Sequence, residues 1–253
     1  MNSQSKWFPY FVEENVKCLL FCFPFCGGGM LAFSGWKRQF PATIGVNSVI
    51  LPGRDARQVE PFYTSFAHLI EDLTDEIFPL LSKPFVFFGH SFGALVAFEL
   101  ARALENRGKR AMLLCVSAHR PPRTPLMCSP LHMLEEGLFI EKILDYGGTP
   151  SSIFTEPILK NIYLPLLRAD FTLWETYCYS PGPLLHCPIS IFGGLEDHTV
   201  DTANLNLWEE ETIQPCSLQL FKGNHFFLKD CQSELISTLT QQIKNNLEIR
   251  EQK

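Results

Sequence analysis

The sequence lacks the features that would direct a protein to a membrane, to nucleic acid or to export. No apolar run reaches the ~20 residues that a membrane-spanning helix needs. The 21 basic residues are outnumbered by 27 acidic ones and form no cluster, so a surface for nucleic acid is not expected. A signal-peptide pattern at the N-terminus is also absent. We therefore expect a cytoplasmic protein that binds neither nucleic acid nor membrane.

Paired cysteine motifs are missing as well. The nine cysteines are an odd number without a CxxC pair, and several lie in strand-like apolar runs such as KCLLFCF. The spacing of Cys18, Cys22 and Cys26 leaves a metal site as an alternative, but cysteines on a buried strand more often act as small hydrophobic residues. We expect reduced thiols and no bound metal.

Short apolar runs alternate with longer helical patterns along the chain, which predicts an α/β fold with a mostly parallel sheet flanked by helices. A chain of 253 residues with 46% hydrophobic content can bury one sizeable core, so we expect a single domain over residues 1–253. The six expected strands are 17–23, 46–51, 84–88, 111–117, 187–192 and 216–221.

Helical patterns connect these strands, and one region interrupts the alternation. Residues 91–107 predict a helix directly after the third strand. A proline-rich exit from the fourth strand precedes further helical patterns, which predicts a helical lid inserted at about residues 126–182. An amphipathic helix is expected before the third strand, because apolar residues recur at helical spacing at Phe66, Leu69, Ile70, Leu73, Ile77 and Leu80.

The segment GHSFG, residues 89–93, places Ser91 between two glycines where the third strand meets the next helix. Glycines lack a Cβ atom, so strand and helix can approach closely around a sharp turn from which the serine hydroxyl projects. The pattern predicts that Ser91 is a catalytic nucleophile. An ordinary strand-to-helix loop is the alternative.

A serine hydroxyl becomes a good nucleophile only when a base takes its proton, and that base needs a carboxylate to orient it. Asp197 follows the fifth strand in GGLEDHTV, and His225 follows the sixth in KGNHFFL, in the chain order typical of α/β-hydrolases. Glu196 remains an alternative acid. We expect His90 and His198 to neighbour the site without acting as its base. The other histidines are expected to be structural: His68, His119, His132 and His186.

The oxyanion formed by serine attack on a carbonyl needs preorganised donors, each worth about 3 kcal/mol. One expected donor is the backbone N–H of Phe92, the residue after the nucleophile. The second is expected from FPFCGGG, residues 23–29, because its glycines let the backbone approach a substrate closely.

Taken together, the motifs resemble the stand-alone type II thioesterases of nonribosomal peptide and polyketide synthetases, and the related medium-chain thioesterase of fatty acid synthesis. The resemblance spans nearly the whole chain and rests on these segments: FCFPFCGGG, LPGRDAR, FFGHSFGALVAFELARALE, YGGTP, LPLLRADF, ETYCY, CPISIFGGLED and GNHFFL. It implies an α/β-hydrolase fold with a catalytic triad of Ser91, Asp197 and His225. It also implies oxyanion donors at the backbones of Cys26 and Phe92, which stand where alanine and methionine are usual.

The resemblance implies a serine thioesterase that needs no cofactor and removes incorrect or stalled acyl groups from the phosphopantetheine arm of acyl or peptidyl carrier protein domains. We expect it to act as a monomer. The alternatives are a medium-chain fatty acyl thioesterase, a carboxylesterase, and a non-catalytic binding module on a hydrolase scaffold.

Two further sets of residues are candidates for substrate and carrier recognition. The apolar residues of the expected lid could shield an acyl chain, or could form only the packing face of a helix: Leu164, Leu166, Leu167, Phe171 and Trp174. Arginines after two strands could dock an acidic carrier, or could be solvated loop residues: Arg54, Arg57, Arg120 and Arg123.

Overall fold

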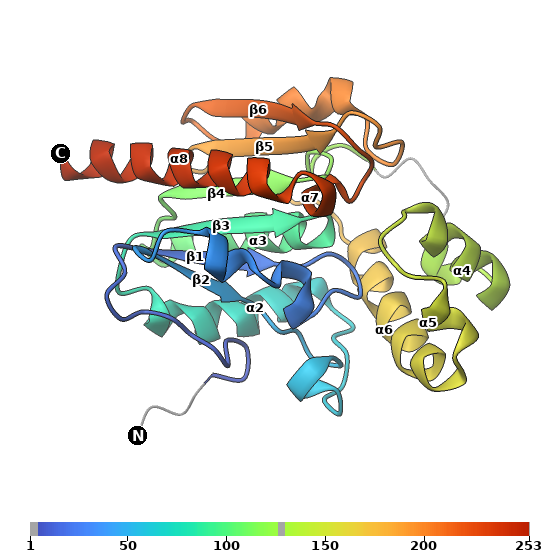
Figure 1. The fold of residues 1–253 in the computed structure, drawn as a ribbon. Helices are drawn as coiled ribbons and strands as arrows, with labels where there is room; N and C mark the ends of the chain where they lie inside the picture. The colour runs from blue at the N-terminus through green and yellow to red at the C-terminus, as the bar shows by residue number, and fades with distance from the viewer. Residues whose placement is uncertain (1–4, 126–129, 253) are drawn as a thin grey trace.

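The computed structural model describes residues 5–125 and 130–252 and contains a six-stranded parallel sheet (Figure 1). The strand order is β2-β1-β3-β4-β5-β6, and every adjacent pair is parallel. The strands are β1 Cys18–Phe23, β2 Ile44–Ser48, β3 Phe85–His90, β4 Leu113–Ser117, β5 Ile189–Gly194 and β6 Cys216–Phe221. The predicted α/β-hydrolase architecture is therefore confirmed.

Strand boundaries differ most from the prediction at β2. The expected strand 46–51 begins at Ile44 and ends at Ser48, although Val49, Ile50 and Leu51 are all buried. Val49 donates a last backbone hydrogen bond to Cys22, and the chain then leaves the sheet while staying inside the core. A run of hydrophobic residues predicts burial, but it does not distinguish a buried strand from the buried loop that follows it.

Helices cover both faces of the sheet. One face packs against α2 Phe66–Ile77, α3 Phe92–Asn106 and the 3-10 helix η5 Thr202–Glu211. The other face packs against α1 Trp36–Gln39, α7 Phe227–Asp230 and α8 Gln232–Glu251. The expected apolar stripe of α2 is buried at Leu69, Ile70, Leu73 and Ile77, whereas Leu80 lies beyond the helix in a 3-10 turn. The remaining 3-10 helices are η1 Met30–Phe33, η2 Asp55–Arg57, η3 Phe78–Leu80 and η4 Leu131–Met133.

The segment between β4 and β5 carries helices α4 Glu136–Asp145, α5 Ser152–Thr155 and α6 Pro157–Glu175. In Figure 1 these inserted helices lie beyond the arrowheads of the strands, at the edge where the carboxyl ends of the strands meet. Their position matches the expected insertion, whose predicted start near residue 126 lies outside the described residues. Ligand sites of parallel sheets form at this edge.

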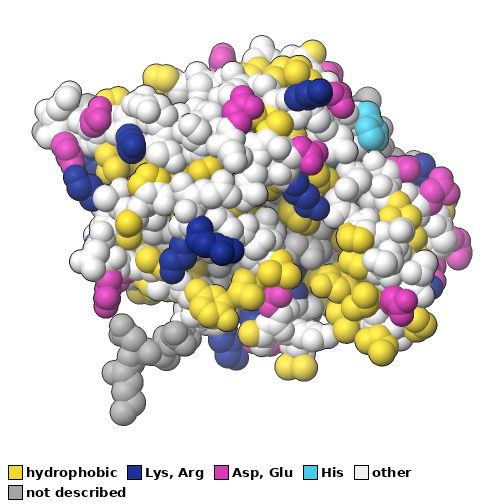
Figure 2. Space-filling model, in the orientation of Figure 1, with side chains coloured by type: hydrophobic (Ala, Val, Ile, Leu, Met, Phe, Trp, Pro, Cys, Tyr) yellow, Lys and Arg dark blue, Asp and Glu magenta, His cyan; other side chains and the backbone are white. Residues whose placement is uncertain are grey.

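Among the described residues, no helix is long and apolar enough to cross a membrane. Figure 2 shows basic and acidic side chains interspersed on one face of the molecule. Hydrophobic side chains gather at the lower right of that view, where Figure 1 places α5 and α6. The exposed residues of α6 include Ile158 and Leu159.

Candidate active site

Ser91 occupies a strained turn between β3 and α3. Its backbone has φ 54° and ψ −123°, a positive φ that a residue with a Cβ atom rarely adopts. The neighbouring glycines make this turn possible: a Cβ on Gly89 would lie 2.1 Å from the Gly93 carbonyl oxygen, and one on Gly93 would lie 2.0 Å from the Phe23 oxygen. The strain and the two close approaches explain why serine stands between glycines here.

The three residues predicted for the triad lie in one hydrogen-bonded row. His225 Nε2 is 2.9 Å from Ser91 Oγ, and His225 Nδ1 is 2.8 Å from Asp197 Oδ2. Asp197 follows β5 and His225 follows β6, so adjacent parallel strands deliver both side chains to the edge where β3 ends. With Nδ1–H donating to the carboxylate, Nε2 is left as the acceptor for the serine proton.

Asp197 is held by more than its histidine. Thr199 donates two hydrogen bonds to Asp197 Oδ1, from its backbone N–H at 2.9 Å and from its hydroxyl at 2.7 Å. Burial alone would raise the pKa of Asp197, but the hydrogen bonds from His225 and Thr199 outweigh it and lower the pKa below its usual value. Glu196, the alternative acid, has an exposed side chain.

Thr199 is a site residue that the sequence analysis missed. Its hydroxyl oxygen lies 2.9 Å from His225 Nδ1, so it contacts both the acid and the base. The signal was present in the sequence, because an aspartate commonly accepts from the backbone N–H two residues later in a local turn. Asp197 and Thr199 have this spacing.

The loop after β1 supplies backbone N–H groups beside the nucleophile. We call residues 25–30 the oxyanion loop. Asp170 accepts from the Gly27 N–H at 2.7 Å, and the Phe25 carbonyl accepts from the Gly28 N–H at 2.8 Å. Within the described part of the chain, no acceptor receives a hydrogen bond from the N–H of Cys26 or of Phe92. These two groups, which the resemblance implies as oxyanion donors, are therefore available to a ligand.

A cavity of about 650 Å³ opens at Ser91 and His225, within the usual range for small-molecule sites. Its wall combines strand-end loops with the inserted helices. Cys26, Ala118 and His119 come from the loops, and Leu167, Phe171 and Trp174 come from α6. Leu167, Phe171 and Trp174 are three of the five expected lid residues, and all three line the cavity. Leu164 packs in the small hydrophobic cluster among the inserted helices, and Leu166 is buried.

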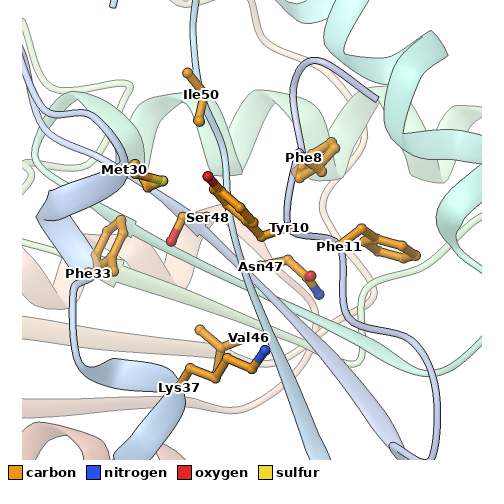
Figure 3. Close-up of a pocket in the computed structure, with 10 residues that line it drawn as sticks. All are labelled: Phe8, Tyr10, Phe11, Met30, Phe33, Lys37, Val46, Asn47, Ser48 and Ile50. Atoms are coloured by element: carbon orange, nitrogen blue, oxygen red, sulfur yellow. The ribbon is translucent and has the colours of Figure 1, made fainter. Parts of the chain in front are cut away.

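A second, smaller cavity of about 130 Å³ lies away from this site (Figure 3). It is bounded by Phe8, Tyr10 and Phe11 of the N-terminal segment and by β2 residues such as Val46 and Asn47. No residue of the hydrogen-bonded row lines it.

His90 and His119 are buried beside the site, as non-catalytic neighbours. His90 Nδ1 is 2.9 Å from the Ser117 hydroxyl, and its ring lies 5.4 Å from that of His225. His119 Nε2 accepts from the Trp174 indole N–H at 3.0 Å, so this ring joins the end of β4 to α6. Burial holds the pKa of His90 well below its usual value and lowers that of His119 to about 3. Both rings are therefore neutral at neutral pH.

Two of the four arginines expected on a docking surface are buried instead. Arg54 and Arg57 are each 5% exposed. Arg54 binds Asp170, and Arg57 binds Glu60 and lies 4.1 Å from the Trp7 ring centre. Their expected role in docking is wrong, because both guanidinium groups are satisfied inside the fold.

Arg120 lines the cavity, and the partly exposed Arg123 binds Glu210 and Glu211.

Four of the described cysteines are buried, namely Cys18, Cys22, Cys115 and Cys187, whereas Cys178 is exposed. Cys18 and Cys22 are fully buried in β1, and Cys26 lines the cavity. The described cysteines are free thiols. In residues 5–125 and 130–252, no three His, Cys, Asp or Glu side chains are grouped so that they could hold a metal ion.

A parallel sheet whose strand ends carry a serine, a histidine and an aspartate in hydrogen-bonding order defines the α/β-hydrolase class. Within this class, the Thioesterase domain family matches residues 19–243, and the chain belongs to that family. It is accordingly a hydrolase that acts on thioester bonds.

Known proteins agree with this assignment. The chain is 37% identical over 245 residues to the gramicidin S biosynthesis protein GrsT of Aneurinibacillus migulanus. The aligned residues cover 95% of this chain and 94% of GrsT. The solved structure of the type II thioesterase BorB from the borrelidin biosynthetic cluster has a TM-score of 0.84 at 30% identity, covering 93% of this chain and 94% of BorB. The medium-chain S-acyl fatty acid synthase thioesterase of Rattus norvegicus is more distant, at 29% identity over 237 residues, covering 88% of this chain and 89% of the relative. The resemblance to type II thioesterases is confirmed.

Proposed function

We propose that this thioesterase uses Ser91, His225 and Asp197 as a catalytic triad to hydrolyse acyl thioesters on the phosphopantetheine arms of carrier proteins, clearing incorrect or stalled acyl groups. The observation that carries the proposal is the row of hydrogen bonds in which His225 lies 2.9 Å from Ser91 Oγ and 2.8 Å from Asp197. That geometry suits proton transfer from the serine hydroxyl to the imidazole.

In the first step, Ser91 Oγ attacks the thioester carbonyl while its proton passes to His225 Nε2. The charge that develops on the carbonyl oxygen is stabilised by the backbone N–H groups of Cys26 and Phe92, and the charge on the imidazolium by Asp197. The tetrahedral intermediate then collapses with cleavage of the carbon–sulfur bond. A thiol of pKa ~8.5 is a good leaving group, and His225 returns the proton to it.

In the second step, water attacks the acyl ester of Ser91. His225 Nε2 takes a proton from the water, and the new tetrahedral intermediate expels Ser91 Oγ, which recovers a proton from His225. The products are the free acid and the free enzyme. These steps use only side chains, backbone and water, so we propose that no cofactor takes part.

The cavity supports an acyl chain as the substrate's variable part. Leu167, Phe171 and Trp174 give its α6 wall an apolar surface. The carrier domain itself would dock outside this cavity, near the loops that surround its mouth.

The setting of the reaction follows from the relatives. GrsT is a gramicidin S biosynthesis protein and BorB belongs to a borrelidin biosynthetic cluster. We propose that this chain serves a comparable peptide or polyketide assembly line as a cytoplasmic monomer. A medium-chain fatty acyl thioesterase is the second candidate, favoured by the more distant fatty acid synthase thioesterases.

The test compares three substrates with wild type and Ser91→Ala: an acyl-carrier protein, the matching small acyl thioester, and the matching oxygen ester. We expect the wild type to hydrolyse the acyl-carrier protein most efficiently and Ser91→Ala to hydrolyse none. Preference for the oxygen ester would indicate a carboxylesterase. Failure of the wild type to hydrolyse any of them, with no labelling of Ser91 by a fluorophosphonate, would indicate a binding module.

A panel of carrier proteins loaded with chains of different length separates the two thioesterase candidates. Turnover of short acyl and aminoacyl groups supports an editing role. Turnover restricted to medium-length saturated chains would support the fatty acyl alternative.

A further inference from the structure

Side chains from two distant segments hold the oxyanion loop in place. Asp170 on α6 accepts from the Gly27 N–H at 2.7 Å, and Arg54 after β2 donates to the Gly28 carbonyl at 2.9 Å. Asp55 accepts from the Met30 N–H at 2.7 Å at the end of the loop. Carboxylates and a guanidinium therefore bind three backbone groups on the C-terminal side of Cys26: the Gly27 N–H, the Gly28 carbonyl and the Met30 N–H.

Arg54 and Asp170 also bind one another through two parallel hydrogen bonds. The Nη1–Oδ2 distance is 2.8 Å and the Nη2–Oδ1 distance is 2.7 Å. The two side chains are 5% and 3% exposed, so the pair is almost fully shielded from water. A forked pair of this kind fixes orientation as well as distance, which a lysine or a single hydrogen bond would not do.

Helix α6 packs directly on the loop at the same point. Gly27 has φ +73°, and a Cβ on it would lie 2.5 Å from Leu167 Cδ2. Leu167 and Phe171, one turn apart on α6 around Asp170, line the cavity. Arg54 and Asp170 themselves do not line it. The helix that contacts the substrate cavity is therefore bound to the loop through Asp170.

We propose that the buried Arg54–Asp170 pair is a positioning device that couples α6 to the oxyanion loop and holds the Cys26 N–H in place for the developing oxyanion. This inference rests on the proposed function, because it assigns the second oxyanion donor to Cys26. The pair engages the Gly27 N–H and the Gly28 carbonyl directly after Cys26, whose own N–H has no acceptor among the described residues. Neither side chain touches the substrate.

A double variant separates positioning from stability. Removing one partner leaves a buried charge without its counterion, which destabilises any fold, whereas replacing both partners with apolar residues often preserves stability. In Arg54→Met/Asp170→Leu we expect the melting temperature to stay near that of wild type. Because no side chain then binds the Gly27 N–H or the Gly28 carbonyl, we expect kcat for a small acyl thioester to fall about 10- to 100-fold, somewhat less than after loss of an oxyanion donor.

Two readouts distinguish a displaced oxyanion donor from general damage. The KM for the small thioester should change less than about threefold, because only the transition state uses the loop. The inhibition constant of a trifluoromethyl ketone analogue, which forms a tetrahedral adduct with the nucleophile, should rise in parallel with the loss of kcat. Arg54→Lys, which keeps the charge but loses the fork, should show the same pattern if the double variant fails to fold.

Arg57→Met is the matched control. Arg57 lies three residues from Arg54 and is equally buried, but it binds Ile50 and Glu60 and has no contact with the oxyanion loop. We expect it to lower the melting temperature while kcat stays near the wild-type value. An equal fall of kcat in Arg57→Met, or a normal kcat in a folded double variant, would overturn the inference.

Inactivity of the wild type would count against the proposed function and would leave no kcat to compare. Hydrogen exchange of the oxyanion loop then tests whether the Arg54–Asp170 pair positions it. Faster exchange of the peptide that carries residues 25–30 in the double variant, with unchanged exchange in Arg57→Met, supports positioning. Unchanged exchange in both variants would overturn it.

Discussion

The two walls of the active site come from regions of different origin. Ser91, Asp197 and His225 follow strands β3, β5 and β6, so the parallel sheet places the reacting groups. The opposite wall, with Leu167, Phe171 and Trp174, comes from α6 between β4 and β5. In the proposed mechanism the first wall carries the chemistry, and the second faces the acyl group of the substrate.

The proposed division of roles separates the reacting groups from the residues that shape the acyl site. Substitutions on α6 can reshape the cavity without moving the strand ends that hold the triad. The two regions are nevertheless joined at particular points, the Arg54–Asp170 pair at the oxyanion loop and the His119–Trp174 hydrogen bond at the end of β4. Variants in the sheet wall, the joints and the rim should therefore have effects of decreasing size.

The largest effect is expected at the nucleophile on the sheet wall. Ser91→Ala should lower kcat by about 10⁶-fold and leave the melting temperature near that of wild type, because the change removes the attacking oxygen only. Cys26→Ala removes the thiol that lines the cavity but keeps the backbone N–H, so it should retain serine-dependent turnover. Substantial turnover by a folded Ser91→Ala enzyme would place the chemistry elsewhere.

The second-largest loss of kcat is expected at the acid, Asp197. Asp197→Asn should lower kcat by about 10⁴-fold, because an amide cannot stabilise the imidazolium and favours the wrong tautomer of His225. Glu196→Gln is its matched control, and should stay within about threefold of wild type since its exposed side chain is outside the hydrogen-bonded row. Steady-state kinetics at one pH compares kcat of Asp197→Asn with kcat of Glu196→Gln. Greater damage from Glu196→Gln would reverse the assignment.

His119, whose hydrogen bond to Trp174 joins the two regions, should make the free energy of unfolding depend on pH. Burial lowers the pKa of His119 to about 3, so between pH 6.5 and pH 3 the unfolded chain binds a proton that the folded chain excludes. This histidine should therefore cost about 1.4 kcal/mol of unfolding free energy for each pH unit below ~6.5, and nothing above it. His90, whose pKa burial also lowers, adds a loss of the same sign.

Urea unfolding between pH 4 and pH 7 measures this slope. His119→Gln should flatten it by about one proton, because the titrating ring is gone. Trp174→Phe removes the hydrogen bond to His119 Nε2 but keeps the titrating ring of His119. It should therefore lower stability at every pH with little change of slope. An unchanged slope in His119→Gln would contradict the assignment of a buried neutral ring.

The smallest effect is expected at the rim. Arg120 follows β4 and lines the cavity, and Arg120→Glu should raise the KM for an acidic acyl-carrier protein about three- to tenfold at low salt, with little change for a small acyl thioester. Lys17→Glu is the control, because it makes the same charge change directly before β1, at the end of this strand that is away from the oxyanion loop. Equal effects on both substrates would indicate damage to the cavity instead of docking.

The sequence predicted the sheet wall better than the rest, for a physical reason. Parallel strands bring their carboxyl ends to one edge, so residues far apart in the chain, such as Asp197 and His225, can be assigned from their place after a strand. The Arg54–Asp170 pair joins residues 116 positions apart, and no local pattern marks such a contact. Charged residues are usually exposed, so Arg54 and Arg57 were expected on the surface, and only the structure shows the partners that bury them.

The central claim is that the acyl group passes through Ser91. Its most direct test is peptide mass mapping of the enzyme after rapid acid quenching with an acyl thioester. The account predicts that the acyl mass appears on the peptide containing Ser91 and disappears in Ser91→Ala. An acyl adduct on Cys26 in an active enzyme, or full turnover by Ser91→Ala, would contradict it.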